Sequence, residues 1–229
     1  MERKTQKPIP LKEAASSLLK ELPKSHDNDK LQFYMRHRTE VLQTEAAKEL
    51  MFKEGFPRKY VNAVWDGVDA QTRVIAQTFI SDYYLKSLAT RPPGLYVCGA
   101  VGVGKSSLVT LMMLHLVKIF SHSVRFVSLE NLVTMMFQRD WDNVNKKMNA
   151  AVLVIDDVGR NYDVDFSVSK FNGFMEHRYS NELPTFFTSN LSPHDLRERN
   201  GYDRIADLLF DKNWCKVLTY GGTSMRGAV

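Results

Sequence analysis

The sequence has only two cysteines among its 229 residues, Cys98 and Cys215, and they form no Cys-x-x-Cys pair. This scarcity excludes a disulfide framework and a cysteine-rich zinc module, and a reducing, cytoplasmic location is the default expectation. No stretch approaches the roughly 20 apolar residues of a membrane-spanning helix. Residues 1–11 are charged, unlike a secretory signal. We therefore expect an ordinary globular protein with no membrane partner.

The sequence also lacks a strong charge of either sign. Its formal net charge is +5, with a pI near 9.1, and most of the excess lies in residues 1–60. Such a mild basic balance suits a nucleic-acid partner but does not establish one. The function must therefore be inferred from motifs.

The chain divides into two regions with different patterns. Residues 1–55 are rich in Lys, Glu, Gln and His, and their apolar residues follow a helical spacing, which predicts a small helical N-terminal region. In residues 56–229, short β-prone runs alternate with longer helical stretches, which is typical of an α/β domain with a central parallel five-stranded sheet. The predicted strands are Leu95–Cys98, Val124–Val127, Ala151–Ile155, Thr185–Thr188 and Cys215–Thr219.

The most specific motif lies between the first predicted strand and an apolar helix predicted over Leu108–Phe120. Residues 99–106 fit the pattern Gly-x4-Gly-Lys-Ser/Thr of a phosphate-binding P-loop, whose backbone amides and helix N-terminus face phosphates. Lys105 is expected to reach the β and γ phosphates of ATP, and the Ser106 hydroxyl to bind Mg²⁺. The alternative, a glycine-rich turn that only precedes a helix, is disfavoured by the flanking strand and helix. The predicted nucleotide contacts are Gly99, Val101, Gly102, Val103, Gly104, Lys105, Ser106 and Ser107.

Two carboxylates end the buried run Ala151–Ile155. We expect Asp156 to hold the metal, directly or through water, and Asp157 to act as the general base that activates the attacking water. Many P-loop ATPases carry Glu at the second position, so Asp157 has a shorter reach. The alternative is an acidic cap on the following segment.

A polar amide follows the next predicted strand. The segment Thr188-Ser189-Asn190 places Asn190 at the same edge of the sheet, where an amide can hold the attacking water or contact the γ-phosphate. Taken alone, this segment would be a helix cap. Its position one strand after Asp156 favours a site residue.

These three motifs, in this order, resemble those of the AAA+ ATPases of the DnaC, DnaI and IstB group. This group comprises bacterial and phage replicative helicase loaders and their transposition relatives. Phe56–Tyr60 resembles the segment that introduces the ATPase domain and lies close to adenine, which implies that Tyr60 contacts the nucleotide. The resemblance covers roughly residues 56–226. It implies an AAA+ ATPase domain at 56–229 that hydrolyses ATP slowly and is stimulated by partners.

Two arginines also resemble family residues. Arg204 resembles the box VII arginine finger that is presented to the ATP of a neighbouring copy, which implies self-association as well. Many relatives carry two arginines four residues apart here, and the first of these positions falls on Asn200. Arg226 resembles the near-terminal sensor 2 arginine. For both, a surface salt bridge is the alternative.

The resemblance further implies a single-stranded DNA partner, held along Leu129–Met148. Aromatic side chains for stacking and basic side chains for phosphates occur in this stretch: Phe137, Arg139, Trp141, Lys146 and Lys147. The alternative is an amphipathic helix that packs Leu132, Met135 and Met136 on the sheet and leaves a solvated polar face.

In the loaders, the N-terminal region grips the hexameric replicative helicase. Here Leu18, Leu22, Leu31 and Tyr34 are the candidate anchors, and packing on the ATPase domain is the alternative.

We therefore expect an ATP-dependent loader of a replicative helicase onto single-stranded DNA during replication initiation. An IstB-like ATPase acting with a transposase is the alternative, and the lack of a helix-turn-helix pattern in residues 1–55 slightly favours the loader. The Asp-Asp and Thr-Ser-Asn motifs argue against a small-molecule kinase. A nucleotide-binding module without hydrolysis remains open.

Overall fold

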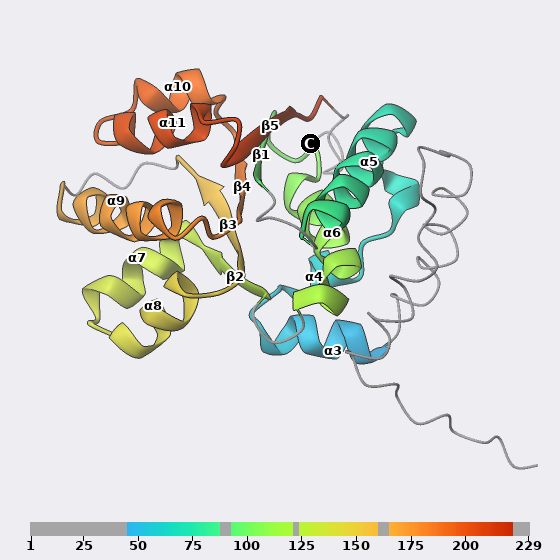
Figure 1. The fold of residues 1–229 in the computed structure, drawn as a ribbon, viewed down its shortest axis with the longest axis horizontal. Coiled ribbons are helices and arrows are strands. Elements are labelled where there is room, and N and C mark those ends of the chain that lie inside the picture. The colour runs from blue at the N-terminus through green and yellow to red at the C-terminus, as the bar shows by residue number, and fades with distance from the viewer. Residues whose placement is uncertain (1–44, 88–92, 121–123, 160–164, 222–229) are drawn as a thin grey trace, which may run out of the picture. The chain divides into compact units, whose positions relative to one another are not determined.

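The computed structural model describes residues 45–87, 93–120, 124–159 and 165–221, which lie within one compact unit, Leu42–Val229. Arg226 and residues 1–44 of the predicted N-terminal region lie outside the described residues. The described part is an α/β domain with helices on both faces of a sheet (Figure 1). No helix in the described ranges is long and apolar enough to span a membrane.

The sheet has five strands in the order β2-β3-β4-β1-β5, and every neighbouring pair is parallel. Their bounds are β1 Gly94–Cys98, β2 Val124–Ser128, β3 Val152–Val158, β4 Thr185–Ser189 and β5 Cys215–Thr219. All five predicted strands are confirmed, with ends that differ by at most three residues. Because parallel strands end at one edge, the segments after β1, β3 and β4 meet in the middle of that edge. These are the segments that carry the three motifs.

The helices form two layers. The elements α3, α4, α5 and α6 lie on one side of the sheet, and α7 to α11 lie on the other (Figure 1). Their bounds are α3 Glu45–Lys53, α4 Arg58–Val61, α5 Ala70–Ser87, α6 Lys105–Phe120, α7 Leu129–Phe137, α8 Trp141–Met148, α9 Asp165–Ser180, α10 Pro193–Arg197 and α11 Asp203–Phe210, with a 3₁₀ turn η1 at Trp65–Gly67. Helix α3, which falls within the predicted N-terminal region, packs against α4 and α6.

The sheet core explains why its strands read as unbroken apolar runs. Strands β1 and β4 are buried at every position, and β3 at all but Asp157, as expected for a parallel sheet covered on both faces.

One buried charge has a structural role at the opposite, amino-terminal edge of the sheet. Arg178 of α9 is fully buried and donates to the Thr185 hydroxyl and to the carbonyls of Lys147, Met148, Ala150 and Pro184.

The stretch 129–148 forms two helices rather than one. Ser128 caps α7, where its hydroxyl accepts from the Asn131 amide, and Asp140 caps α8, where its carboxylate accepts from the Asn143 amide. Arg139 between them has a φ of 57°, in the left-handed region that ends a helix. The chain therefore turns at the point where Phe137 and Trp141 lie.

Candidate functional site

The P-loop follows β1 and leads directly into α6, which begins at Lys105, three residues before the predicted start. Gly99 allows the close approach of β5's end, because a Cβ there would lie 2.1 Å from the Tyr220 carbonyl oxygen. Gly104 has a φ of 95°, a conformation that L side chains rarely adopt, and its carbonyl accepts from the Leu108 amide at 2.9 Å. The sequence therefore builds a tight turn at a helix N-terminus, which is a geometry that binds anions.

Lys105 connects this turn to the end of β4. Its ammonium is buried and donates to the Gly99 carbonyl at 2.9 Å, to the Ala100 carbonyl at 2.7 Å and to Asn190 Oδ1 at 2.8 Å. Three acceptors offset much of the cost of burying the charge. The structure thus places Asn190 beside Lys105, at the edge of the sheet where the sequence places both residues.

Ser106 and Asp156 also meet. The Ser106 hydroxyl donates to Asp156 Oδ1 at 2.6 Å, so the two oxygens are close enough to share one ion. A hydroxyl and a carboxylate oxygen are the hard ligands that Mg²⁺ prefers. These two side chains therefore fit the predicted metal.

Thr188 also belongs to the site, although only Asn190 of the Thr-Ser-Asn segment was expected to act there. Its hydroxyl donates to Asp156 Oδ1 and accepts from the Asp157 amide at 3.0 Å. The side chain is almost fully buried. Thr188 thus orients the metal-side carboxylate and satisfies the backbone beside it, a supporting role that ligand residues commonly need.

Burial raises the pKa of the Asp156 carboxyl, and the like charge of Asp157 adds to this effect. Hydrogen bonds from Ser106 and Thr188 and the positive charge of Lys59 lower it in part. A cation bound beside this buried carboxyl would stabilise its charged form. Lys59 lies within the Phe56–Tyr60 segment, and no sequence motif marks it as a site residue.

Asp157 lies in a β-bulge. The regular pairing of β3 with β4 shifts between Ile155 and Val158, and Asp157 has a φ of 60°. Bulges beside active sites re-aim side chains, and Asp tolerates this conformation better than most residues. The proposed general-base role of Asp157 stays a prediction.

The other expected nucleotide contacts surround the P-loop. Val101 is exposed, whereas Val103 is buried in the domain, so only the backbone of Val103 is available to a phosphate. Tyr60 is half-buried on α4, which packs against α6, and the Lys59 ammonium lies 4.6 Å from its ring centroid. The contact of Tyr60 with the base stays a prediction.

Arg204 lies in the first turn of α11 and forms an ion pair with Glu176 of α9, and the two side chains are 64% and 40% exposed. The surface salt bridge is therefore present, and the role as an arginine finger stays a prediction. Arg226, the second expected arginine, lies outside the described residues.

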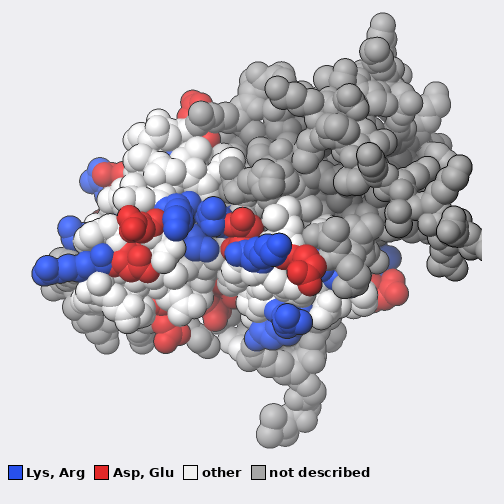
Figure 2. All heavy atoms as spheres, turned by 90° about the horizontal axis from the view of Figure 1, so that it is seen from below, with Lys and Arg blue, Asp and Glu red and all other residues white. Residues whose placement is uncertain are grey.

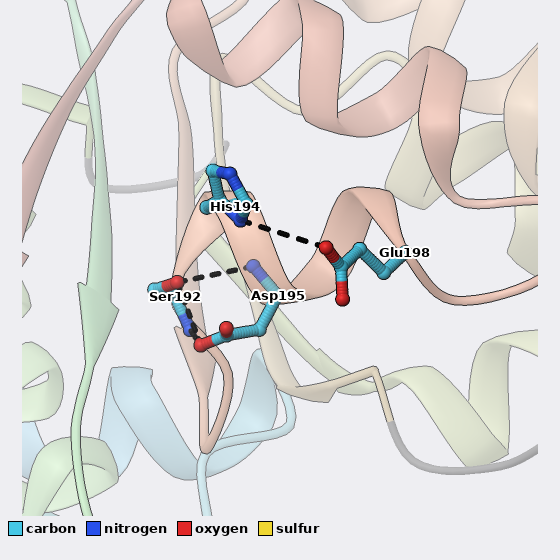
Figure 3. A network of polar contacts seen from close by, with 4 residues as sticks. All are labelled: Ser192, His194, Asp195 and Glu198. Atoms are coloured by element: carbon cyan, nitrogen blue, oxygen red, sulfur yellow. Dashed lines mark hydrogen bonds and ion pairs between the residues drawn. The ribbon is translucent and has the colours of Figure 1, made fainter.

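A Ser-His-Asp set after β4 is a helix cap rather than a catalytic triad (Figure 3). The Ser192 hydroxyl donates to Asp195 Oδ2 at 2.7 Å and accepts from the Asp195 amide, which forms a capping box. His194 instead lies 4.0 Å from the Glu198 carboxylate. This cap starts α10 directly after Asn190 and fixes the chain there.

The turn between α7 and α8 presents an aromatic and basic surface. Phe137 and Trp141 are 49% and 44% exposed, and Arg139 and Lys146 are also exposed. Leu132 and Met136 are buried, with Met135 packed beside them, so the amphipathic alternative holds for the opposite face of α7.

Lys147, expected at the DNA, instead turns inward to the Phe126 carbonyl. The face on which α3 and α8 lie, seen from below in Figure 2, mixes Lys and Arg with Asp and Glu. Among the described residues of this face, no basic patch is free of acidic neighbours.

Comparison with known proteins finds replication factors among those similar to this chain. No protein-family model matches it. It is 30% identical over 118 residues to the replicative helicase loader DnaI of Bacillus subtilis, a match that spans 48% of this chain and 37% of that protein. The chain thus matches little more than a third of this relative's length.

Among solved structures, DnaI has a TM-score of 0.60 at 24% identity over 75% of this chain and 95% of that chain. The DnaC helicase loader has a TM-score of 0.55 at 23% identity over 71% and 99%. The initiator DnaA, bound to AMPPCP and single-stranded DNA, has a TM-score of 0.55 at 17% identity over 72% and 51%. The sheet order and these neighbours confirm the AAA+ P-loop fold, and the expected resemblance to the DnaC and DnaI helicase loaders is confirmed.

Proposed function

We propose that this protein is an ATP-dependent loader of a hexameric replicative helicase onto single-stranded DNA during replication initiation. The observation that carries the proposal is the constellation at the carboxyl edge of the sheet, where Lys105 meets Asn190 and Ser106 meets Asp156. It occurs in a chain whose sequence is similar to that of a helicase loader. None of the similar proteins named above is a transposition ATPase.

The geometry supports binding and hydrolysis of ATP. Lys105 would exchange its carbonyl acceptors for the β and γ phosphates, and the amides of the P-loop would face the same oxygens. Ser106 and Asp156 would hold Mg²⁺, which supplies charge neutralisation at the phosphates when bound. Asp157 would take a proton from the attacking water, and the Asn190 amide would orient that water.

Slow, partner-stimulated turnover would follow from a role of Arg204 as an arginine finger. An arginine that stabilises the transition state from a neighbouring copy makes hydrolysis depend on assembly. In the single chain, Arg204 is paired with Glu176. Because both side chains are exposed, this pair is weak and can be exchanged for a phosphate at little cost.

Single-stranded DNA binding is proposed at the α7–α8 turn. Trp141 and Phe137 would stack on bases, and Arg139 and Lys146 would contact phosphates. Because acidic and basic groups alternate on the adjoining face, we expect moderate affinity that falls with salt.

Helicase capture is the experiment that tests the function. The full chain should retain the replicative helicase from the same genome in a pull-down, and the amount retained should change when ATP is added. A variant that lacks residues 1–41 keeps the compact unit from Leu42, including α3, and should bind nucleotide without capturing helicase. Undiminished capture by that variant would refute the role proposed for the N-terminal region, and no capture by the full chain would refute the loader function.

A further inference from the structure

Three segments of the domain are joined beside the edge strand β2. The Lys147 ammonium of α8 donates to the Phe126 carbonyl of β2 at 2.7 Å. The Phe126 amide donates to the Glu54 carbonyl, in the turn after α3, at 3.0 Å. The Glu54 carboxylate pairs with Arg125 of β2 at 2.7 Å. We name these four residues, Glu54, Arg125, Phe126 and Lys147, the edge clasp.

The clasp is tightly packed. Gly55 has a φ of 96°, and a Cβ there would lie 2.9 Å from the Phe126 carbonyl oxygen and 3.4 Å from Lys147 Nζ. Lys147 is half-buried, and burial together with the nearby Arg125 lowers its pKa to about 8. A lysine on a helix surface ordinarily keeps its ammonium in water. Here the ammonium instead fills a specific position between β2 and the turn.

On one side, the clasp reaches the proposed DNA surface. Helix α8 begins at Trp141 and also carries Lys146, and both side chains are exposed. Lys147 is the next residue after Lys146, so its hydrogen bond fixes α8 against β2. The orientation of the stacking and basic groups therefore depends on this contact.

On the other side, the clasp reaches the nucleotide site. The Phe126 ring lies 5.1 Å from the Phe56 ring and 6.4 Å from the Tyr60 ring, measured between centroids. The segment that carries these rings continues in α4, which packs against α6. A continuous series of packed groups thus runs from α8 to α6, the helix that carries Lys105 and Ser106.

We propose that the edge clasp couples nucleotide binding to single-stranded DNA binding, with Lys147 as the positioning residue that links α8 to Phe56–Tyr60. This inference rests on the proposed function, because it requires both ligands. A nucleotide that shifts α4 moves the Phe126 ring, and with it the carbonyl that holds Lys147. Packed elements transmit such shifts between discrete arrangements, and the coupling must act equally in both directions.

The test is a linkage measurement on the full chain. The Kd of a fluorescent oligothymidine is measured by anisotropy without nucleotide and with a saturating non-hydrolysable ATP analogue. We expect the wild-type ratio of the two Kd values to differ from one by about fivefold or more. The analogue's Kd, with and without oligothymidine, should change by the same factor.

Lys147→Met keeps the apolar stem and removes the hydrogen bond. This variant should bind each ligand alone. Its ratio of oligothymidine Kd values, without and with the analogue, should be close to one. Lys146→Met is the matched control on the same helix: it should weaken DNA binding in both states and keep the wild-type ratio. Glu54→Gln removes the ion pair with Arg125 but leaves the backbone bonds. Its ratio of Kd values should lie between the wild-type ratio and one.

The possible results distinguish the coupling role of the edge clasp from the proposed function. A folded Lys147→Met protein with the wild-type ratio would overturn the coupling role, as would a wild-type protein that binds both ligands with a ratio of one. If Lys147→Met fails to fold, an unchanged ratio in Glu54→Gln would overturn it instead. A wild-type protein that binds neither ligand would contradict the proposed function and the coupling together.

Discussion

Replacing Thr188 with Val tests whether the second hydroxyl on Asp156 matters. Valine has nearly the same shape, so the change removes two hydrogen bonds and leaves the packing of β4 largely intact. The lost bond to a charged acceptor costs about 1.5–3 kcal/mol, and the orphaned Asp157 amide adds about 1–3 kcal/mol. We expect a decrease of about 3 kcal/mol in the free energy of unfolding, which lowers Tm by roughly 6–12 °C in a domain of this size.

The same substitution should weaken the metal site. Loss of a group that orients a metal ligand typically costs about 10–100-fold in metal affinity, so the Mg²⁺ concentration that supports half-maximal nucleotide binding should rise by about that factor. Urea unfolding and a Mg²⁺ titration of nucleotide binding measure the two effects. Thr188→Ser retains the hydroxyl and is the matched control. Stability of Thr188→Val within about 0.5 kcal/mol of wild type, with unchanged Mg²⁺ dependence, would refute the role given to this side chain.

The remaining predictions concern other groups at the site and its surfaces. Because burial raises the folded-state pKa of Asp156, the folded state binds more protons than the unfolded chain between that raised pKa and the ordinary value near 3.8. Without metal, stability should therefore rise as pH falls through this window, and urea midpoints of Asp156→Asn should lack that rise; parallel pH profiles would contradict it. Asp157→Asn should keep nucleotide affinity and lower kcat by about 10²-fold or more in a phosphate-release assay, because an amide takes no proton; equal turnover would show that another group activates the water. Trp141→Ala should weaken oligothymidine binding by about 1–3 kcal/mol in anisotropy titrations without changing nucleotide affinity, and unchanged DNA affinity would remove α8 from the DNA site.

The features that the sequence predicted well are local. The P-loop lies between a strand and an apolar helix, all within about two dozen residues. The elements that confirm a P-loop are therefore adjacent to it in the sequence. Apolar runs ending in carboxylates predicted β3 and the position of Asp156 for the same reason. The parallel five-stranded sheet followed from the alternation of such runs with helices.

The features that the sequence did not predict depend on contacts across the fold. Thr188 reaches Asp156 because β4 lies beside β3 and because a bulge shifts their pairing. Neither fact is encoded in the Thr-Ser-Asn pattern. Lys147 resembles any lysine on a polar helix face, and only the position of the turn at Glu54 draws its ammonium inward. The split between α7 and α8 did have a local signal in Asp140, a capping residue placed before Asn143.

Nucleotide binding by the wild-type chain and by Lys105→Met, measured by calorimetry with and without Mg²⁺, tests the central claim most directly. The account predicts Mg²⁺-dependent binding of ATP to the wild type. Loss of charge-assisted hydrogen bonds to two phosphates should weaken binding by about 3 kcal/mol or more in Lys105→Met, which is about 100-fold. Equal affinity of the two proteins for ATP, or binding that does not depend on Mg²⁺, would contradict the proposed nucleotide site.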